Sequence, residues 1–151
     1  PRTARRCSPS TGTDGPMGLR VSTDDRLLDV DRIHRWLSED AYWSVGRSRA
    51  AVEQSLRHSV NLGAYDEDVQ VGFLRIVTDR ATFAWVCDVY VDPSARGRAV
   101  GKALMTECDR MLTSYGVKRA LLATADAHGL YAQFGFAPLV DDGRWLVRTY
   151  E

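Results

Sequence analysis

Small residues and positive charges alternate in the stretch DPSARGRAVGKALM. Gly97 and Gly101 lie where an amphipathic helix is about to begin, and Arg96, Arg98 and Lys102 lie between and beside them. Small residues let backbone N–H groups approach a ligand closely, and the first turn of a helix presents unpaired N–H groups at the positive end of its dipole. This combination is typical of a site that binds a phosphate or a pyrophosphate.

Two well-known phosphate-binding motifs do not fit this stretch. A P-loop, G-x-x-x-x-G-K-S/T, needs one more residue between Gly97 and Gly101, and it needs a hydroxyl where Ala103 follows Lys102. The dinucleotide fingerprint G-x-G-x-x-G also fails, because the runs before the loop are patterned as antiparallel strands. The pattern that fits is Q/R-x-x-G-x-G/A, over residues 96–101.

With its flanks, this motif resembles the pyrophosphate loop of the GNAT superfamily of acyl-CoA-dependent N-acyltransferases. The run VYVDPSARGRAVGKALM is similar to that family's strand–loop–helix, and GLYAQFGF is similar to its closing lYxxxGF signature. The resemblance covers residues 19–150 and is strongest over 83–136. One departure is Ala99, which stands where the family usually has glycine.

The resemblance implies that the anion is the pyrophosphate of coenzyme A, with acetyl-CoA as co-substrate. In the family, a splay between two central parallel strands admits the pantetheine arm. Here the arm is expected to pair with the main chain of Val89 and Val91, and an N–H near Val89 is expected to polarise the thioester carbonyl. The residues that the resemblance assigns to the cofactor are Val89, Tyr90, Val91, Arg96, Gly97, Arg98, Ala99, Val100, Gly101, Lys102, Thr124 and Tyr131.

Acyl transfer from a thioester to an amine needs a neutral amine, a polarised carbonyl and a proton for the leaving thiolate. Tyr131 matches the family tyrosine that hydrogen-bonds the sulfur, and a phenol of pKa about 10 is suited to protonate a thiolate. The alternative is a core tyrosine that packs beside Phe134 and Phe136. We expect Tyr131 to be the general acid.

Asp88 is the first candidate for the general base, because it interrupts an otherwise apolar strand and burial could raise its pKa. Its alternative role is a structural hydrogen bond to a loop. Strand alternation places Cys87 and Val89 on the face opposite to Asp88, unless a β-bulge changes the count.

The sequence gives less support for a catalytic role of the other reactive side chains. His128, just before Tyr131, could be a base or a proton relay, or a structural or exposed residue. Asp126 is expected to cap the last short helix. Cys87 could challenge direct transfer as a nucleophile, but the sequence places no obvious base beside it. No His, Cys or carboxylate set has the spacing of metal ligands, so no metal is expected.

In the resembling family, the first two helices and their connection form one wall of the acceptor site. That connection here carries Tyr42 and Trp43, with Arg47 and Arg49 close by, and His58 ends the second helix. We expect Tyr42, Trp43 and His58 to contact the acceptor. The two aromatic residues could form a lid or half of a cation-binding box, or they could plug the core.

These residues must be positioned by alternating strands and helices. The hydrophobic periodicity predicts the order β-α-α-β-β-β-α-β-α-β. A right-handed crossover should make 83–91 and 120–123 parallel neighbours. We expect an α/β (α+β) sandwich: a mixed, mostly antiparallel sheet with a splayed central parallel pair and helices on both faces. The predicted strands are 19–21, 61–66, 69–79, 81–91, 119–124 and 144–150, of which 119–124 should be buried on both faces.

Composition indicates one soluble domain over residues 19–151. Residues 1–18 are predicted to be a flexible arm or a non-native segment, with Met17 as a plausible start; a basic targeting peptide is the alternative. The formal net charge of +0 excludes long-range attraction to nucleic acid or an anionic membrane. Reduced, buried thiols fit the three cysteines best, which favours a cytoplasmic location.

The sequence therefore predicts an acetyl-CoA-dependent N-acetyltransferase that acts on a small-molecule or peptide amine by direct attack in a ternary complex. The alternative is a catalytically silent acyl-CoA-binding sensor or partner module. The aromatic segment RWLVRTY could pair across a homodimer interface. The acceptor stays open among small amines, amino acids, antibiotics, polyamines and peptide N-termini.

Overall fold

The computed structural model describes residues 18–140 and 142–150, and its centre is one five-stranded sheet. The strands lie side by side in chain order. The first four pair antiparallel and the last two pair in parallel, so the predicted mixed sheet is confirmed. The strands are β1 (Leu19–Ser22), β2 (Val60–Asp66), β3 (Val69–Thr78), β4 (Phe83–Val91) and β5 (Arg119–Leu121).

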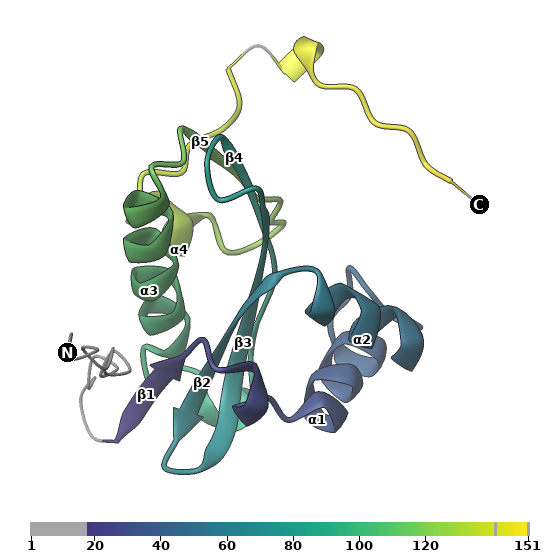
Figure 1. Ribbon diagram of the computed structural model, residues 1–151, viewed down its shortest axis with the longest axis vertical. Helices are drawn as coiled ribbons and strands as arrows, with labels where there is room; N and C mark the ends of the chain where they lie inside the picture. The colour runs from purple at the N-terminus through teal and green to yellow at the C-terminus, as the bar shows by residue number, and fades with distance from the viewer. Residues whose placement is uncertain (1–17, 141, 151) are drawn as a thin grey trace, which may run out of the picture.

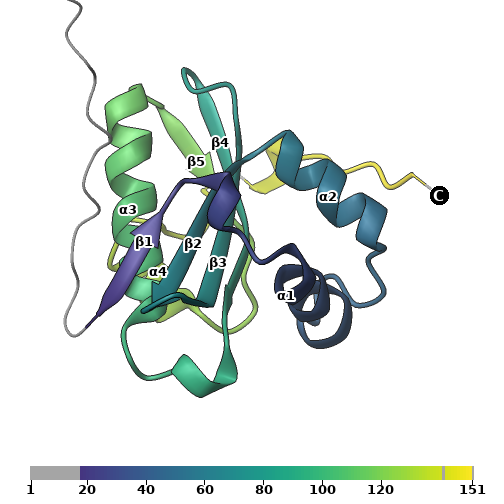
Figure 2. The ribbon, with the colours of Figure 1, turned by 60° about the horizontal axis from the view of Figure 1, so that its bottom comes forward.

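Helices cover both faces of the sheet, as predicted (Figure 1). On one face, α3 (Val100–Tyr115) packs across β1 to β4, and α4 (His128–Ala132) contacts α3. The helices α1 (Val30–Arg35) and α2 (Arg49–Arg57) lie on the other face (Figure 2). They form a second apolar cluster that includes Phe73. Each side of the sheet therefore has its own core.

The first helix does not stop where α1 ends. It continues as one π-helical turn, η2 (Trp36–Asp40), which closes with the N–H of Ala41 donating to the carbonyl of Trp36 at 2.8 Å. Such turns are uncommon and occur often at functional sites. This turn leads directly into the connection formed by residues 41–47, called the aromatic loop below.

A β-bulge interrupts β4 at Asp88. In the β3–β4 ladder, Phe73 pairs with Tyr90 and Arg75 pairs with Cys87. Moving two residues along β3 therefore corresponds to moving three residues along β4. Asp88 itself has a φ of 52°, in the left-handed region. Because of this extra residue, Asp88 lies beside Cys87 on the face of α1 and α2, whereas Val89 packs toward α3. Strict alternation, which would put Cys87 and Asp88 on opposite faces, therefore does not hold, and the β-bulge alternative is confirmed.

β4 and β5 separate after a short parallel stretch. Their pairing ends at Trp85 and Leu121, although β4 continues to Val91. The predicted strand 119–124 is thus limited to Arg119–Leu121, and the residues after it turn away from β4. This divergence is the predicted splay, but the pair lies at one edge of the described sheet and not at its centre, because no described strand pairs with the far side of β5. The prediction that β5 is buried on both faces is wrong, since Arg119 is exposed and the other two residues are only half-buried.

The predicted last strand, 144–150, is also wrong. A short 3₁₀ turn, η4 (Asp142–Arg144), is followed by a segment without strand pairing that extends from the body of the molecule (Figure 1). Leu146 and Val147 are 95% and 93% exposed. The alternating pattern is suited to a strand, but a strand needs a ladder partner, and β5 does not pair with this segment. Pairing across a homodimer stays a prediction.

The predicted N-terminal arm lies outside the described residues, apart from Gly18. Across 18–140 and 142–150, none of the helices has the length and apolar character needed to cross a membrane.

Candidate functional site

The loop before α3 presents backbone donors. Gly97 and Ala99 have φ values of 76° and 61°, in the left-handed region. Ala99 is the N-cap residue and has no side chain that could accept a hydrogen bond, and the first helical bond runs from Ala103 N to the Ala99 carbonyl. The N–H groups of Val100, Gly101 and Lys102 therefore have no acceptor within the helix. They lie at the positive end of its dipole, and the helix is 16 residues long. This geometry fits an anion.

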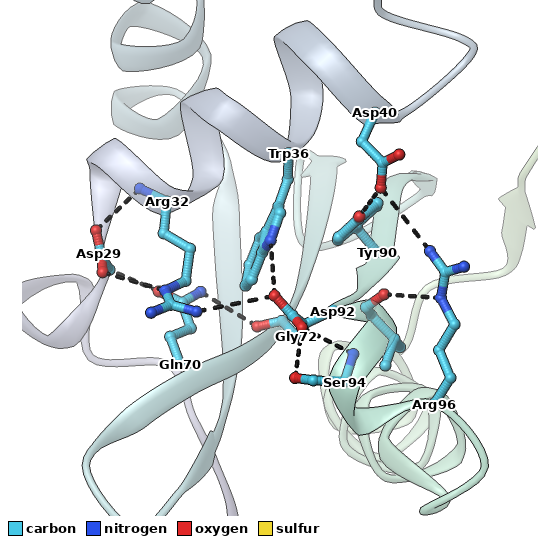
Figure 3. Close-up of polar contacts among 11 residues, drawn as sticks. Asp29, Arg32, Trp36, Asp40, Gln70, Gly72, Tyr90, Asp92, Ser94 and Arg96 are labelled. Atoms are coloured by element: carbon cyan, nitrogen blue, oxygen red, sulfur yellow. Dashed lines mark hydrogen bonds and ion pairs between the residues drawn. The ribbon is translucent and has the colours of Figure 1, made fainter.

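Asp92 fixes the path from β4 into this loop (Figure 3). Its Oδ1 accepts hydrogen bonds from the N–H and hydroxyl of Ser94, at 2.9 and 2.6 Å. Its Oδ2 accepts from Nε1 of Trp36 at 3.2 Å and lies 3.8 Å from Nη1 of Arg32. The bonds from Ser94 lower the pKa of Asp92, although partial burial opposes them. Sequence reasoning missed this anchor, although an Asp-Pro pair after a strand is a known turn signal.

Arg96 leans back toward the helical layer (Figure 3). Its Nε donates to the carbonyl of Val91 at 3.2 Å, and its Nη2 lies 3.9 Å from Oδ2 of Asp40. The hydroxyl of Tyr90 donates to the same carboxylate, and burial with this bond raises the pKa of Tyr90 to about 12. The Tyr90 side chain is thus packed under η2, so only its main chain is available for the predicted cofactor contact.

The other predicted phosphate-binding residues differ in their surroundings. Arg98 forms an ion pair with Asp66 at 2.7 Å and is half exposed, while Lys102 is exposed. Gly101 packs closely: a Cβ there would lie 3.3 Å from Cδ2 of Leu130 on α4. A side chain at position 101 would therefore require a small shift of Leu130.

A cavity of about 280 Å³, called the central cavity below, lies beside the splay. β4 and its bulge, the segment after β5, α4 and the aromatic loop contribute to its walls. It brings together residues from five separate stretches of the chain. The lining residues are Tyr42, Trp43, Arg47, Arg75, Trp85, Val86, Cys87, Asp88, Val89, Leu122, Ala123, Thr124, Asp126, Ala127 and Tyr131.

Tyr131 lies at the α4 side of the central cavity and is 8% exposed. Its ring packs edge-on against Phe136, with 6.3 Å between the centroids. Burial, and secondarily the charge of Asp126, raises the pKa of Tyr131 to about 12. The phenol keeps its proton at neutral pH, as a phenol of the ordinary pKa of about 10 also does, and the raised pKa makes it a weaker acid.

Asp88 is enclosed by three donors. Its Oδ2 accepts from Arg47 Nη1 at 2.7 Å and from Arg75 Nε at 2.9 Å, and its Oδ1 accepts from Trp43 Nε1 at 3.2 Å. Burial raises the pKa of Asp88, but the hydrogen bond from Arg47 and the charges of both arginines outweigh burial and hold the pKa below its usual value. The raised pKa considered for a general base is thus wrong, and the alternative, a structural hydrogen bond to a loop, is confirmed.

Tyr42 and Trp43 form the outer wall of the central cavity. They are 59% and 44% exposed, and their rings meet edge-on with 5.0 Å between centroids. The Tyr42 hydroxyl accepts a hydrogen bond from the N–H of Ala125 at 3.2 Å, so the aromatic loop reaches across to the segment after β5. The alternative that these rings plug the core is wrong.

The other predicted site residues lie apart from one another in the structure. His128 is exposed and lines a neighbouring cavity of about 550 Å³, which Thr124 and Tyr131 also line. His58 is exposed at the end of α2 and does not line the central cavity. Asp126 does not cap α4: the N-cap residue is Ala127, and no described side chain accepts a capping hydrogen bond there.

Two further outcomes concern cysteine chemistry and metals. Burial raises the pKa of Cys87 to about 11, so its thiol stays protonated at neutral pH and is a poor nucleophile. Within 18–140 and 142–150, no group of three or more His, Cys, Asp or Glu side chains is arranged to hold a metal ion.

Sequence reasoning missed Arg75 completely. It lies within β3, and only the fold brings it to Asp88, thirteen residues further along the chain. A charged residue inside the apolar run VGFLRIV was the available signal, since a buried charge needs a partner.

The sequence and the fold of this chain are similar to those of known proteins. A model of the Acetyltransferase (GNAT) family matches residues 30–136. A Gibberella zeae protein named "Putative acetyltransferase FG08082" is 32% identical over 133 aligned residues, which cover 75% of each chain. The family match over residues 30–136 thus includes both the aromatic loop and the loop before α3.

Solved structures of other proteins share the overall fold of this chain. A GNAT-family protein from Xanthomonas campestris is 42% identical, with a TM-score of 0.83, over 87% of this chain and 93% of that one. An aminoglycoside 6′-N-acetyltransferase complexed with coenzyme A is similar in fold, with 23% identity and a TM-score of 0.59 over 69% of this chain and 61% of that one.

Proposed function

Because the chain belongs to the GNAT acetyltransferase family, we propose that it transfers an acetyl group from acetyl-CoA to a primary amine in a ternary complex. The observation that carries the proposal is the uncapped start of α3 beside the splay of β4 and β5, with a protonated tyrosine at the adjoining cavity. One solved neighbour of similar fold is a coenzyme A complex.

The residues present fit this cofactor. The N–H groups of Val100, Gly101 and Lys102 are suited to the pyrophosphate, with Arg98 and Lys102 able to add charge. Beyond Trp85, the edge of β4 that faces the splay lacks a strand partner in the described chain, so main-chain groups at Val89 and Val91 can take a pantetheine arm. Bound there, acetyl-CoA would supply the activated acetyl group as a thioester.

Tyr131 is assigned to hold and donate the proton that the departing thiolate needs. Its pKa of about 12 keeps the phenol protonated, and its position on the central cavity brings it near Val89, whose N–H is assigned to the thioester carbonyl. The protonated thiol of Cys87 supports direct transfer over a covalent enzyme intermediate.

Asp88 is assigned a positioning role instead of the base. A carboxylate that accepts three hydrogen bonds and has a lowered pKa is a weak proton acceptor. We propose that the neutral fraction of the acceptor amine reacts, so the rate should rise with pH along the titration of the acceptor's own amine.

The silent-module alternative is favoured by the same ion-paired Asp88, which leaves the central cavity without an evident base. Release of free thiol from acetyl-CoA, measured across a panel of amines, separates the two. Amine-dependent thiol release with formation of the acetylated amine supports the enzyme. Tight binding of acetyl-CoA without any turnover supports the module.

A further inference from the structure

The central cavity carries more guanidinium charge than its buried carboxylate neutralises. Arg47 and Arg75 both contact Oδ2 of Asp88, and their side chains are only 24% and 14% exposed. Two cations against one anion leave one positive charge in excess. A poorly hydrated charge of this kind is costly without a counter-ion, so the pair favours an anionic ligand.

Both arginines also have N–H donors without a hydrogen-bond acceptor in the described part of the chain. Arg47 donates through Nη1 alone, and Arg75 donates through Nε to Asp88 and through Nη1 to Ser59. In the described part of the chain, nothing accepts a hydrogen bond from the Nη2 group of either arginine. Arginine side chains with free donors are well matched to a planar carboxylate.

The part of the central cavity near Tyr131 carries a negative charge instead of a positive one. Asp126 is the other carboxylate in the lining, and it makes no ion pair with Arg47 or Arg75. It lies close enough to Tyr131 for its charge to raise the tyrosine's pKa. The cavity is thus polarised, with guanidinium groups at the β4 bulge and a carboxylate beside the proposed proton donor.

From this polarity we infer that the acceptor is a small aminocarboxylic acid, held with its carboxylate against Arg47 and Arg75 and its amine toward Tyr131. The inference rests on the proposed function, because it names the substrate class of the same site. The aromatic residues Tyr42, Trp43 and Trp85 line the same cavity, so an apolar side chain fits. A volume of about 280 Å³ suits one amino acid.

Matched acceptors test the carboxylate directly. We would measure kcat/KM for L-leucine and L-phenylalanine beside their carboxamides, which lack only the charge. The carboxamides have the more readily deprotonated amine, so they should react faster if the carboxylate is not recognised. With kcat/KM expressed per neutral amine for each acceptor, we expect the acids to be preferred at least about tenfold, the effect of one charge-assisted hydrogen bond. Equal or better use of the carboxamides on this neutral-amine basis overturns the inference.

Variants tie the preference to the arginine pair. In Arg47→Gln the acid-to-amide ratio should fall by about tenfold or more, and in Arg47→Lys, which keeps the charge but loses the planar donor pair, it should fall by less. Because each ratio compares two acceptors on one preparation, partial unfolding does not change it. The control is Arg49→Gln, which pairs with Asp31 and Glu53 outside the cavity and should keep the wild-type ratio. An equal loss for acids and amides in Arg47→Gln would overturn the inference.

A binding measurement gives a readout without turnover. In calorimetry with saturating coenzyme A, N-acetyl-L-leucine should bind at least about tenfold more tightly than its carboxamide. The proposed function fails if folded protein binds no coenzyme A or acetylates no amine. The inference alone fails if coenzyme A binds and plain amines are acetylated, but the carboxylate gives no advantage.

Discussion

The two sides of the site are built in different ways. The proposed cofactor side, residues 89–101, relies on backbone: a strand edge, two left-handed residues and the open start of α3. The acceptor side relies on side chains from the aromatic loop, β3 and the β4 bulge. A backbone site is contained in one continuous stretch of sequence, whereas a side-chain site exists only after folding.

The two sides should therefore respond differently to substitution. Changes on the acceptor side should alter stability and acceptor choice through buried charge, and changes on the cofactor side should alter coenzyme A affinity through backbone conformation. The predictions below test this difference.

Asp88→Asn should have the largest effect on stability. It leaves Arg47 and Arg75 without their counter-charge, and breaking a buried ion pair in this way costs roughly 3–5 kcal/mol. Urea denaturation measures the loss. Asp68→Asn, on the exposed turn between β2 and β3, is the control and should change little. A loss below about 1 kcal/mol would show that the cluster does not hold the site together.

The same cluster predicts a dependence of stability on pH. The folded-state pKa of Asp88 is lowered, so its contribution is present above the ordinary aspartate value of about 4 and is lost as the pH falls through the folded-state pKa. The difference in unfolding free energy between wild type and Asp88→Asn should shrink as the pH drops below about 4. A difference that grows on acidification would contradict the ion-paired carboxylate.

Tyr131→Phe tests the point where the two sides meet. We expect kcat to fall by roughly one to three decades, because the proton donor for the thiolate is lost, while coenzyme A affinity by calorimetry changes little. In the wild type, activity should not decline with an apparent pKa near 10, since the tyrosine titrates at about 12. An unchanged kcat in Tyr131→Phe would remove this residue from the mechanism.

Substitutions in the loop before α3 should have smaller, opposite effects. Gly97 has a φ of 76° and open space around it, so Gly97→Ala adds conformational strain of about 1 kcal/mol without a clash. Ala99→Gly removes the strain of a left-handed alanine and should tighten coenzyme A binding slightly. Calorimetry and thermal melting measure both. Equal affinities in wild type and both variants would indicate that the loop conformation does not matter for binding.

His58→Gln should have the smallest effect. His58 is exposed and is not part of the central cavity, despite its predicted role in acceptor binding. We expect kcat/KM to stay within about twofold of wild type, as for a surface substitution. A tenfold loss with any acceptor would show that the end of α2 closes over the acceptor.

The same contrast explains how much could be predicted from the sequence. The order of strands and helices, the splay and the loop over residues 96–101 depend on local periodicity and a contiguous motif, so they were accessible. The partnership of Arg75 with Asp88 was not, because it depends on the register of β3 and β4 and on a bulge that no local pattern marks. The segment 144–150 was predicted to be a strand and does not form one. Its alternation of residues is strand-like, but a ladder partner decides whether a strand forms.

Calorimetric titration of folded protein with coenzyme A and acetyl-CoA tests the central claim most directly. We predict one binding site per chain for each ligand, with affinity that weakens in Gly97→Ala and persists in Tyr131→Phe. A well-folded wild-type protein that gives no binding isotherm with either ligand would contradict the account.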